Sequence, residues 1–405
     1  MILAAVLTSF MLLLFSCSQK NSATRPEEKT GPEQHKAWTF LLYDDADFYN
    51  AYDPLDDFAQ VVSSGDQINY LVLRDSNTTE ASYYKIGTNH EKILLERLGE
   101  LNMGDPGTLE NFINYGKKNY PADRYIVAFY DHGDGWEGVC WDTTNQLDNL
   151  TAAEMNTAIR QTGGTDLILF TAPCAMGSLE AAYQVRDAAQ YYVGSEDASG
   201  FVYWYYLFPD LDLFIKSNPL CTTEELANKI VNLAYEYRNA QGVGSVMTLS
   251  SIKLSELDGL VSSFNRVVNY YSTHVDSFKA FTSKSNMKRY GPNFCDFLGL
   301  LESLYSNEKD PDARQRIEYT MDVFKYCITA EKHGGDEEGS NGMNIYFPQR
   351  IFFGQVYSAP YSIGLDFKRN SGWEKLVVAS LTGTNQSVQG MPNNYFFRLN
   401  GFSPR

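Results

Sequence analysis

A cysteine and a histidine each follow a strand-like segment of this sequence, and together they could form a nucleophilic pair. Cys174 comes directly after the apolar run 166–173, and His132 comes directly after the similar run 124–131. A short apolar run bounded by polar and turn residues predicts a strand that is buried on both faces. A thiol paired with a histidine from elsewhere in the fold is a general arrangement for nucleophilic attack on a carbonyl carbon.

The position of these two residues in a sheet decides whether they can meet. In an open parallel sheet, ligands bind outside the carboxyl ends of the strands. If both runs are strands of one sheet, Cys174 and His132 lie at the same edge. Residues 176–190 have helical composition. We therefore also expect Cys174 at a helix N-terminus, where the dipole and free N–H groups favour a thiolate.

Simpler interpretations compete with this one. A lone cysteine is often a buried structural thiol, and His132 could be a loop histidine that is hydrogen-bonded to Asp131 or Asp134. The strand-end positions of both Cys174 and His132 favour the nucleophilic pair. Cys140 is the alternative thiol, but its apolar neighbours indicate packing.

Length, charge and aromatic content limit the classes of protein to which the chain can belong. The chain has 405 residues, which suggests two units at about 100–200 residues per domain. Its net charge of −17 argues against binding to nucleic acid or to an anionic membrane, because no basic field attracts phosphates. With 28 Tyr and 24 Phe, the chain has the composition of a compact globular protein.

Strand and helix patterns alternate through the first two thirds of the chain. The predicted strands are 38–43, 68–73, 124–131, 166–172, 191–194, 245–249 and 343–347, and the predicted helices are 54–64, 108–118, 151–161, 176–190, 224–238, 255–275, 295–307 and 311–330. This order predicts an α/β fold with three layers, α/β/α, around a mostly parallel sheet. We expect a catalytic domain over 37–252 and a mixed helical C-terminal domain, 253–405, packed on the sheet.

The N-terminus has the features of an export signal. Residues 1–16 are almost wholly apolar, but they are too few to span a membrane. Residues 14–17 resemble a bacterial lipoprotein box, in which Cys17 becomes the lipidated residue, and the polar segment 17–36 would be the tether. We expect export to the bacterial cell envelope, periplasm-facing or surface-exposed, with the lipid anchor as the membrane contact. The alternative is an ordinary secretory signal.

No cofactor requirement is expected. The remaining cysteines, 140, 221, 295 and 327, show no CxxC spacing, and there are five histidines, so a structural zinc site is not predicted. We expect most of these thiols to be free and buried, although four cysteines could also pair in three ways. The carboxylates at 44–47 and 336–338 could hold Ca²⁺, which takes several oxygen ligands, or could be solvated loop charge.

The two runs that end in His-Gly and in Ala-x-Cys resemble the clostripain family of cysteine peptidases, in the caspase-like clan. The segments 38–47, 101–109, 119–122, 247–250 and 344–348 are also similar to that family, so the resemblance covers nearly all of 37–385. It implies a caspase-like fold with Cys174 as nucleophile and His132 as its proton-handling partner. It also implies an oxyanion hole formed by the N–H groups of Gly133 and Cys174.

The sequence departs from that family at the specificity pocket and at the activation loop. Members that cut after Arg or Lys carry an acidic residue at the place of Ala172; here Asp131, Glu196 or Asp197 would have to compensate. Residues 133–159 contain no Lys or Arg for a maturation cut. We therefore expect a single-chain cysteine endopeptidase, acting on protein or peptide substrates, with altered specificity or weak activity. The alternative is a catalytically silent surface lipoprotein that uses the fold as a binding module.

Overall fold

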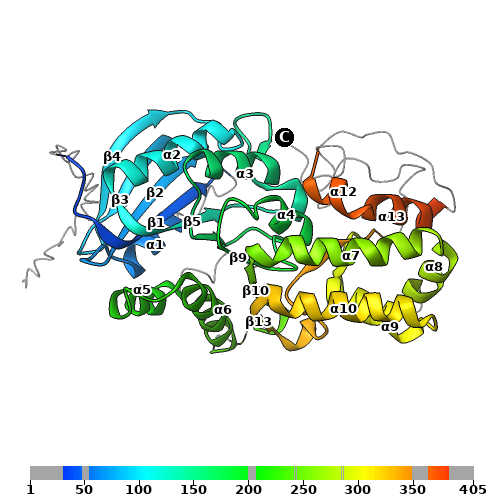
Figure 1. Cartoon of the computed structure of the whole chain (residues 1–405). Helices are drawn as coiled ribbons and strands as arrows, with labels where there is room; N and C mark the ends of the chain where they lie inside the picture. The colour runs from blue at the N-terminus through cyan, green and yellow to red at the C-terminus, as the bar shows by residue number, and fades with distance from the viewer. Residues whose placement is uncertain are drawn as a thin grey trace, which may run out of the picture.

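The computed structural model describes residues 31–47, 54–198, 207–240, 242, 244–283, 285, 287–348 and 364–382 (Figure 1). Its strands are β1 (Lys36–Asp45), β2 (Ile68–Ser76), β3 (Thr79–Ile86), β4 (Lys92–Gly99), β5 (Ala122–Tyr130), β6 (Val139–Asp142), β7 (Asp148–Leu150), β8 (Leu167–Phe170), β9 (Tyr191–Gly194), β10 (Thr248–Lys253), β11 (Arg289–Tyr290), β12 (Phe294–Asp296), β13 (Ile328–His333) and β14 (Asn344–Tyr346). Its α-helices are α1 (Pro54–Val61), α2 (Pro106–Asn119), α3 (Ala152–Gln161), α4 (Leu179–Gln184), α5 (Phe208–Ser217), α6 (Thr223–Ala240), α7 (Leu257–Ser272), α8 (Val275–Ser283), α9 (Phe297–Asn307), α10 (Pro311–Cys327), α12 (Asp366–Ser371) and α13 (Trp373–Thr382).

The central sheet has nine strands in the order β13-β10-β9-β8-β5-β1-β2-β3-β4. The five inner strands, β9, β8, β5, β1 and β2, are parallel to one another. The outer strands on both sides are antiparallel, and the sequence did not predict β3, β4 or β13. The mostly parallel sheet is therefore confirmed, with an antiparallel pair added at each edge.

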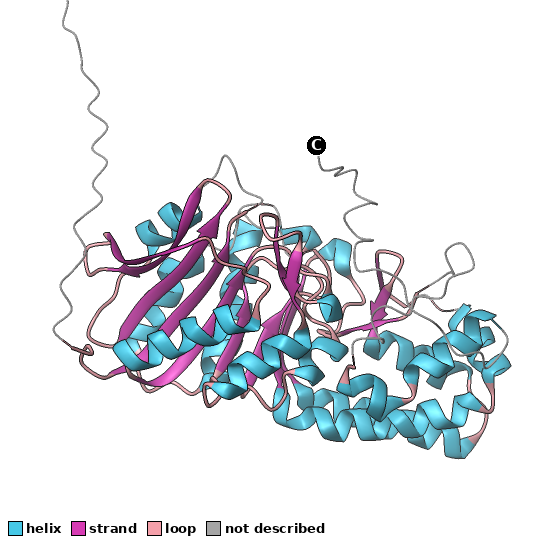
Figure 2. Cartoon of the chain, turned by 90° about the horizontal axis from the view of Figure 1, so that it is seen from above, coloured by secondary structure: helices cyan, strands magenta, loops and turns pink. Residues whose placement is uncertain are grey.

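Helices cover both faces of this sheet (Figure 2). Alternate residues of β1 show how the faces are divided. Leu41 and Tyr43 pack in the core on the side of α2, α3 and α4, while Phe40 and Leu42 pack in the core on the side of α1, α5 and α6. The inner strands are largely apolar on both faces because both faces are buried. The predicted three-layer α/β/α fold is confirmed.

The C-terminal part is mainly helical and continues the core of the sheet. Buried side chains of α7, α9, α10 and α13 belong to the same apolar cluster as those of β1, β5 and β8. From this part β13 returns to pair with β10, and β11, β12 and β14 form a small sheet of their own. The division into domains at residues 252 and 253 stays a prediction.

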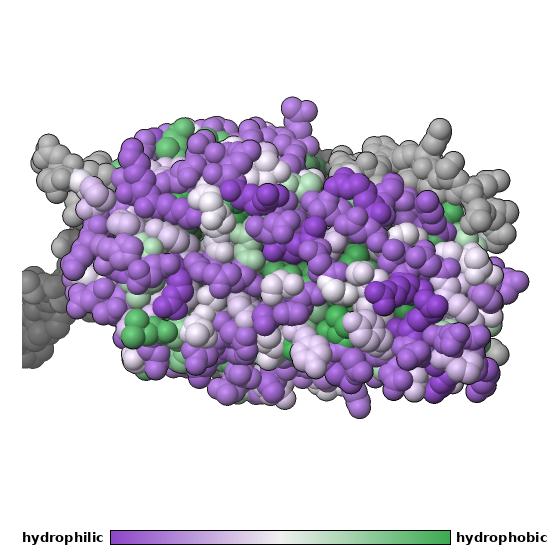
Figure 3. Space-filling view, viewed as in Figure 1, coloured by the Kyte–Doolittle hydropathy of each residue, from purple (hydrophilic) through white to green (hydrophobic). Residues whose placement is uncertain are grey.

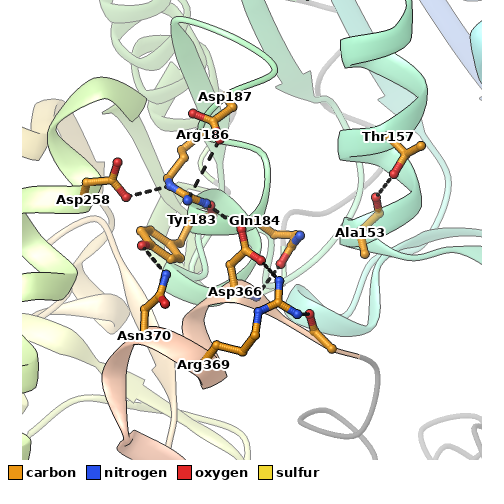
Figure 4. Close-up of polar contacts among 11 residues, drawn as sticks. Ala153, Thr157, Tyr183, Gln184, Arg186, Asp187, Asp258, Asp366, Arg369 and Asn370 are labelled. Atoms are coloured by element: carbon orange, nitrogen blue, oxygen red, sulfur yellow. Dashed lines mark hydrogen bonds and ion pairs between the residues drawn. The ribbon is translucent and has the colours of Figure 1, made fainter.

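Ion pairs also join the two parts. Arg186, just after α4, pairs with Asp258 of α7 at 2.7 Å and with Asp366 of α12 at 3.0 Å (Figure 4). The Arg186 side chain is 14% exposed and its guanidinium lies over the ring of Tyr183. Asn370 of α12 donates to the Tyr183 hydroxyl at 2.9 Å. Helices α7 and α12 of the C-terminal part therefore both hold the end of α4 in place.

Several element boundaries were predicted wrongly, in addition to the missed strands, and two of them show the reason. The strand predicted at 245–249 lies at Thr248–Lys253, after the 3₁₀ turn Gly244–Val246. The helix predicted at 311–330 ends at Cys327, and the chain continues as β13. In both places backbone pairing with a neighbouring strand decides the boundary, and local composition does not report that pairing.

The export signal and Cys17 lie outside the described residues. None of the helices that the structure describes is long and apolar enough to cross a membrane. The face of the molecule shown in Figure 3 is largely hydrophilic, and its apolar patches are small and scattered.

Candidate active site

The strands that precede His132 and Cys174 are neighbours in the sheet. Strands β5 and β8 pair in parallel with Phe129 opposite Phe170, and the Thr171 N–H donates to the Phe129 carbonyl at 3.1 Å. Both chains therefore leave the sheet at the same carboxyl edge. The structure places His132 and Cys174 at one rim, as the sequence predicts.

The loops that carry the two residues are in direct contact at Gly133. A methyl group built on Gly133 would lie 2.5 Å from the Pro173 Cβ and 2.9 Å from the Cys174 carbonyl oxygen. Such distances are shorter than any van der Waals contact, so glycine is needed for this approach. His132 and Cys174 are both partly exposed, which leaves them accessible to a substrate.

Cys174 does not lie at a helix N-terminus, contrary to the sequence prediction. Helix α4 begins at Leu179, and Ser178 caps it by accepting the Ala181 N–H. Gly177 packs against the backbone of Ser195, which keeps the preceding residues out of the helix. The field of a helix dipole falls off within the first turn. A helix dipole therefore does not act on the Cys174 thiol.

Backbone hydrogen bonds fix the segment that follows Cys174. The Ala175 N–H donates to the Asp197 carbonyl at 3.0 Å, and the Gly177 N–H donates to the Ser195 carbonyl at 2.6 Å. Ala175 has a φ of +56°, a left-handed conformation that is strained for a residue with a Cβ. Strain of this kind persists where the surrounding structure determines the backbone, as these bonds do.

Asn344 holds the same segment from the C-terminal part, and the sequence did not identify it as a site residue. Its N–H donates to the Gly177 carbonyl at 2.7 Å, and its Nδ2 donates to the Glu196 carbonyl at 2.7 Å. The side chain is fully buried. Asn344 is the first residue of the family-like segment 344–348, and that resemblance is the sequence signal that could have identified it.

The N–H group of Gly133 is free to bind a ligand atom. Gly133 is buried, and no atom in the described part of the chain accepts a hydrogen bond from its N–H. A buried N–H without an acceptor is rare in folded proteins.

Burial lowers the pKa of His132 to about 4. The cause is the loss of solvent around the ring, which disfavours the charged form. The imidazole ring is therefore neutral at pH 7.

This pKa predicts a pH dependence of stability. An unfolded histidine titrates near pH 6.5, so between pH 6.5 and 4 the unfolded chain binds a proton that the folded chain does not. Stability is therefore lost as the pH falls. We expect the Cys174→Ala protein to lose about 2 kcal/mol more unfolding free energy between pH 7 and pH 5 than Cys174→Ala/His132→Gln. Urea unfolding at both pH values measures this, and equal losses would contradict it.

The residues predicted for a substrate pocket differ in exposure. Ala172, Asp131 and Glu196 have no exposed surface, while Asp197 is partly exposed. Asp131 accepts the Trp141 N–H at 2.8 Å. Of the three acidic candidates, Asp197 is therefore the one that a substrate could reach in this conformation.

Glu196 belongs to a buried acidic pair instead. Burial raises its pKa well above the usual range, and the neighbouring Asp296 raises it further. Asp296 is also buried and accepts hydrogen bonds from Gly299 and from Asn341. Burial therefore disfavours the charged form of Glu196, and its carboxyl group has no exposed surface for a basic substrate side chain.

The other thiols of the described chain are free and buried, as expected: Cys140, Cys221, Cys295 and Cys327. Burial raises the pKa of the Cys140 thiol well above its usual value, and nearby Asp45 and Asp131 add to this effect. Cys140 is therefore unsuited to act as a nucleophile. The partly exposed Cys174 is the thiol that remains for chemistry.

Comparison of this chain with known proteins identifies its relatives. The model of the clostripain family, Peptidase C11, matches residues 41–380. Clostripain from Hathewaya histolytica is 38% identical over 101 residues, which are 22% of this chain and 19% of that protein. The match with this curated relative thus spans about a fifth of its length.

Solved structures show the same fold. A secreted C11 cysteine protease from Bacteroides thetaiotaomicron, in complex with an irreversible peptide inhibitor, has a TM-score of 0.63 at 20% identity. An inactive zymogen C11 protease from Parabacteroides distasonis has a TM-score of 0.63 at 18% identity. Each alignment covers 84% of this chain and 99% of the other.

Proposed function

The chain belongs to the clostripain family, and we propose that it is a cysteine endopeptidase that cleaves peptide bonds with Cys174 and His132. The observation that carries the proposal is the contact of their two loops at Gly133, on neighbouring parallel strands. The fold alone would not support a reaction. A partly exposed thiol and a neutral imidazole at one sheet edge supply the groups that peptide cleavage needs.

The reaction follows from these groups. His132 accepts the thiol proton, and the Cys174 sulfur attacks the peptide carbonyl carbon to form a tetrahedral intermediate. The N–H groups of Gly133 and Cys174 donate to the oxyanion, a contribution of about 3 kcal/mol per donor to the barrier. His132 then protonates the leaving amine. Water hydrolyses the thioester, which releases the second product and restores the thiol.

The substrate preference is proposed to differ from cleavage after Arg or Lys. Ala172 cannot pair with a buried cation, which would cost several kcal/mol unpaired, and Glu196 has no exposed surface. Asp197 is the acidic candidate that remains for any basic preference. The absence of Lys and Arg from 133–159 agrees with a protein that acts as a single chain.

We propose that the protein is exported to the bacterial cell envelope and anchored by a lipid on Cys17. The apolar segment 1–16 and the polar segment 17–36 support this. The related protease from Bacteroides thetaiotaomicron is described as secreted.

The proposal is tested by alkylation of the purified chain with iodoacetamide, followed by mass spectrometry. We expect Cys174 to react at least about tenfold faster than the buried thiols, and His132→Ala to slow that reaction at pH 7. Incubation of the wild-type chain with a peptide library should then yield cleavage products, while the intact mass of the chain stays unchanged. A rate at Cys174 that does not depend on His132, with no peptide cleaved, would favour the silent binding module.

A further inference from the structure

A buried carboxylate lies shortly after the proposed nucleophile in the chain. Glu180 is in the first turn of α4 and has no exposed surface. Its Oε2 accepts a hydrogen bond from the Ser178 hydroxyl at 2.9 Å, and its Oε1 accepts the Tyr346 N–H of β14 at 2.9 Å. Hydrogen bonds to a carboxylate are roughly twice as strong as those between neutral groups. Glu180 therefore ties the start of α4 to β14.

Strand β14 also holds the Cys174 loop through Asn344. The backbone of Asn344 forms a parallel bridge with Ser178, and its N–H donates to the Gly177 carbonyl at 2.7 Å. Its Nδ2 donates to the Glu196 carbonyl at 2.7 Å, in the segment that follows β9. The chain just after Cys174 is thus fixed to β14 at consecutive positions.

The same strand also contacts the loop of His132. The Tyr346 ring packs edge-on against the Trp136 ring, with the two centroids 5.8 Å apart. It packs in the same way against Phe294 of β12 at 5.7 Å, and a methyl group built on Gly135 would lie 3.2 Å from that Phe294 ring. Strand β14 is therefore a shared support for the two loops that carry the thiol and the imidazole.

Strand β14 can act as a support because it is itself fixed. It pairs with β12, where Tyr346 lies opposite Phe294, and the Trp373 Nε1 of α13 donates to the Tyr346 carbonyl at 2.8 Å. Asn344, Tyr346 and Trp373 are all at most 2% exposed. Side chains in a close-packed interior do not shift without disturbing their neighbours. The strand therefore offers a rigid surface to both loops.

We propose that Glu180 and Asn344 are positioning residues that hold the Cys174 thiol against the His132 loop. This inference rests on the proposed function. Glu180 acts through the backbone of β14, and Asn344 acts through the backbone carbonyl groups that accept its hydrogen bonds. The left-handed backbone at Ala175 persists only while its surroundings determine it. Loss of either anchor would let this backbone relax and would displace the sulfur from the imidazole.

Two replacements of Glu180 test this role. Glu180→Leu removes both acceptor oxygens, whereas Glu180→Gln keeps one oxygen for the Tyr346 N–H. We expect Glu180→Leu to lower kcat for peptide cleavage by about 10²-fold while KM changes by less than about threefold, because a displacement of about 1 Å between reacting groups has an effect of this size. Glu180→Gln should keep at least about a tenth of the wild-type kcat, since its amide oxygen restores the bond to β14.

The rate of Cys174 alkylation by iodoacetamide provides a second measurement, which needs no peptide cleavage. We expect Glu180→Leu and Asn344→Ala each to slow this reaction at pH 7 by about tenfold, toward the rate of His132→Ala, because the thiol loses its proton acceptor in all three. Asn344→Ala removes the side-chain bond and keeps the backbone bond. It therefore keeps the test valid if Glu180→Leu does not fold.

Glu308→Leu is the matched control. Glu308 is 6% exposed and accepts the Tyr271 hydroxyl at 2.9 Å, so its replacement also removes a buried carboxylate, but one between helices of the C-terminal part. We expect a lower Tm for Glu308→Leu, with kcat and Cys174 alkylation as in the wild-type chain. Losses in this variant equal to those in Glu180→Leu would overturn the inference, because they would report general destabilisation.

The inference and the proposed function can fail separately. Wild-type kcat and alkylation rates in folded Glu180→Leu and Asn344→Ala, together with a slow His132→Ala, would overturn the inference and leave the proposed function intact. A Cys174 alkylation rate that does not depend on His132 would overturn the proposed function, and the inference with it.

Discussion

Replacement of Cys174 by alanine is expected to lower kcat/KM for peptide cleavage by about 10⁴-fold or more. In the proposed reaction the thiol forms the covalent bond, and removal of a nucleophile costs more than removal of any group that assists it. Cys174 is partly exposed, so the loss of one sulfur should change the unfolding free energy by less than about 1 kcal/mol. Initial rates on a peptide from the library digest, together with urea unfolding, measure both quantities.

Cys140→Ala is the matched control for this substitution. Its sulfur is fully buried, so we expect a loss of stability of roughly 1 kcal/mol with activity retained at temperatures well below Tm. The two variants should thus show opposite patterns, one inactive and stable, the other active and less stable. Activity that survives in Cys174→Ala would remove Cys174 from the mechanism. Loss of activity in a folded Cys140→Ala would point to Cys140 instead.

The inner strands could be predicted from the sequence because they are buried on both faces. The runs 38–43 and 124–131 are mostly apolar, and each corresponds to a parallel strand. The edge strand β4 gives no such signal, since Lys92, Glu96 and Arg97 interrupt its apolar residues. Charged side chains are common on edge strands, where they discourage pairing with other molecules. The same composition hides the strand from sequence analysis.

The candidate site also contains residues that could be predicted from the sequence and residues that could not. Cys174 and His132 could be paired from the sequence because each follows a buried strand, and parallel strands end at one edge. The meeting of Asp75, Glu100 and Asp142 could not be predicted, because Glu100 follows the antiparallel strand β4, which the sequence did not predict. Asn344 was also missed, since its role depends on the return of the C-terminal part to the sheet edge. Contacts between segments that are far apart in the chain leave no local pattern in the sequence.

Substitution of Gly133 by alanine is expected to lower kcat/KM by on the order of 10²-fold, although alanine adds one methyl group. That methyl would lie 2.5 Å from the Pro173 Cβ, whereas carbon atoms pack at about 3.5–4.0 Å. The loops must therefore separate by about 1 Å, and a displacement of that size can cost about 10²-fold in rate. It would shift His132 and the Gly133 N–H relative to the Cys174 sulfur.

The rate of Cys174 alkylation separates this geometric effect from general destabilisation. If the His132 loop moves, iodoacetamide should react more slowly with Cys174 in Gly133→Ala, at temperatures where circular dichroism shows a folded chain. Gly335→Ala is the matched control, because no atom lies within 4 Å of the added methyl and its backbone conformation suits alanine. Full activity in Gly133→Ala would mean that the reacting groups do not meet across this contact. Since the proposed function depends on that contact, the result would count equally against the assignment of His132.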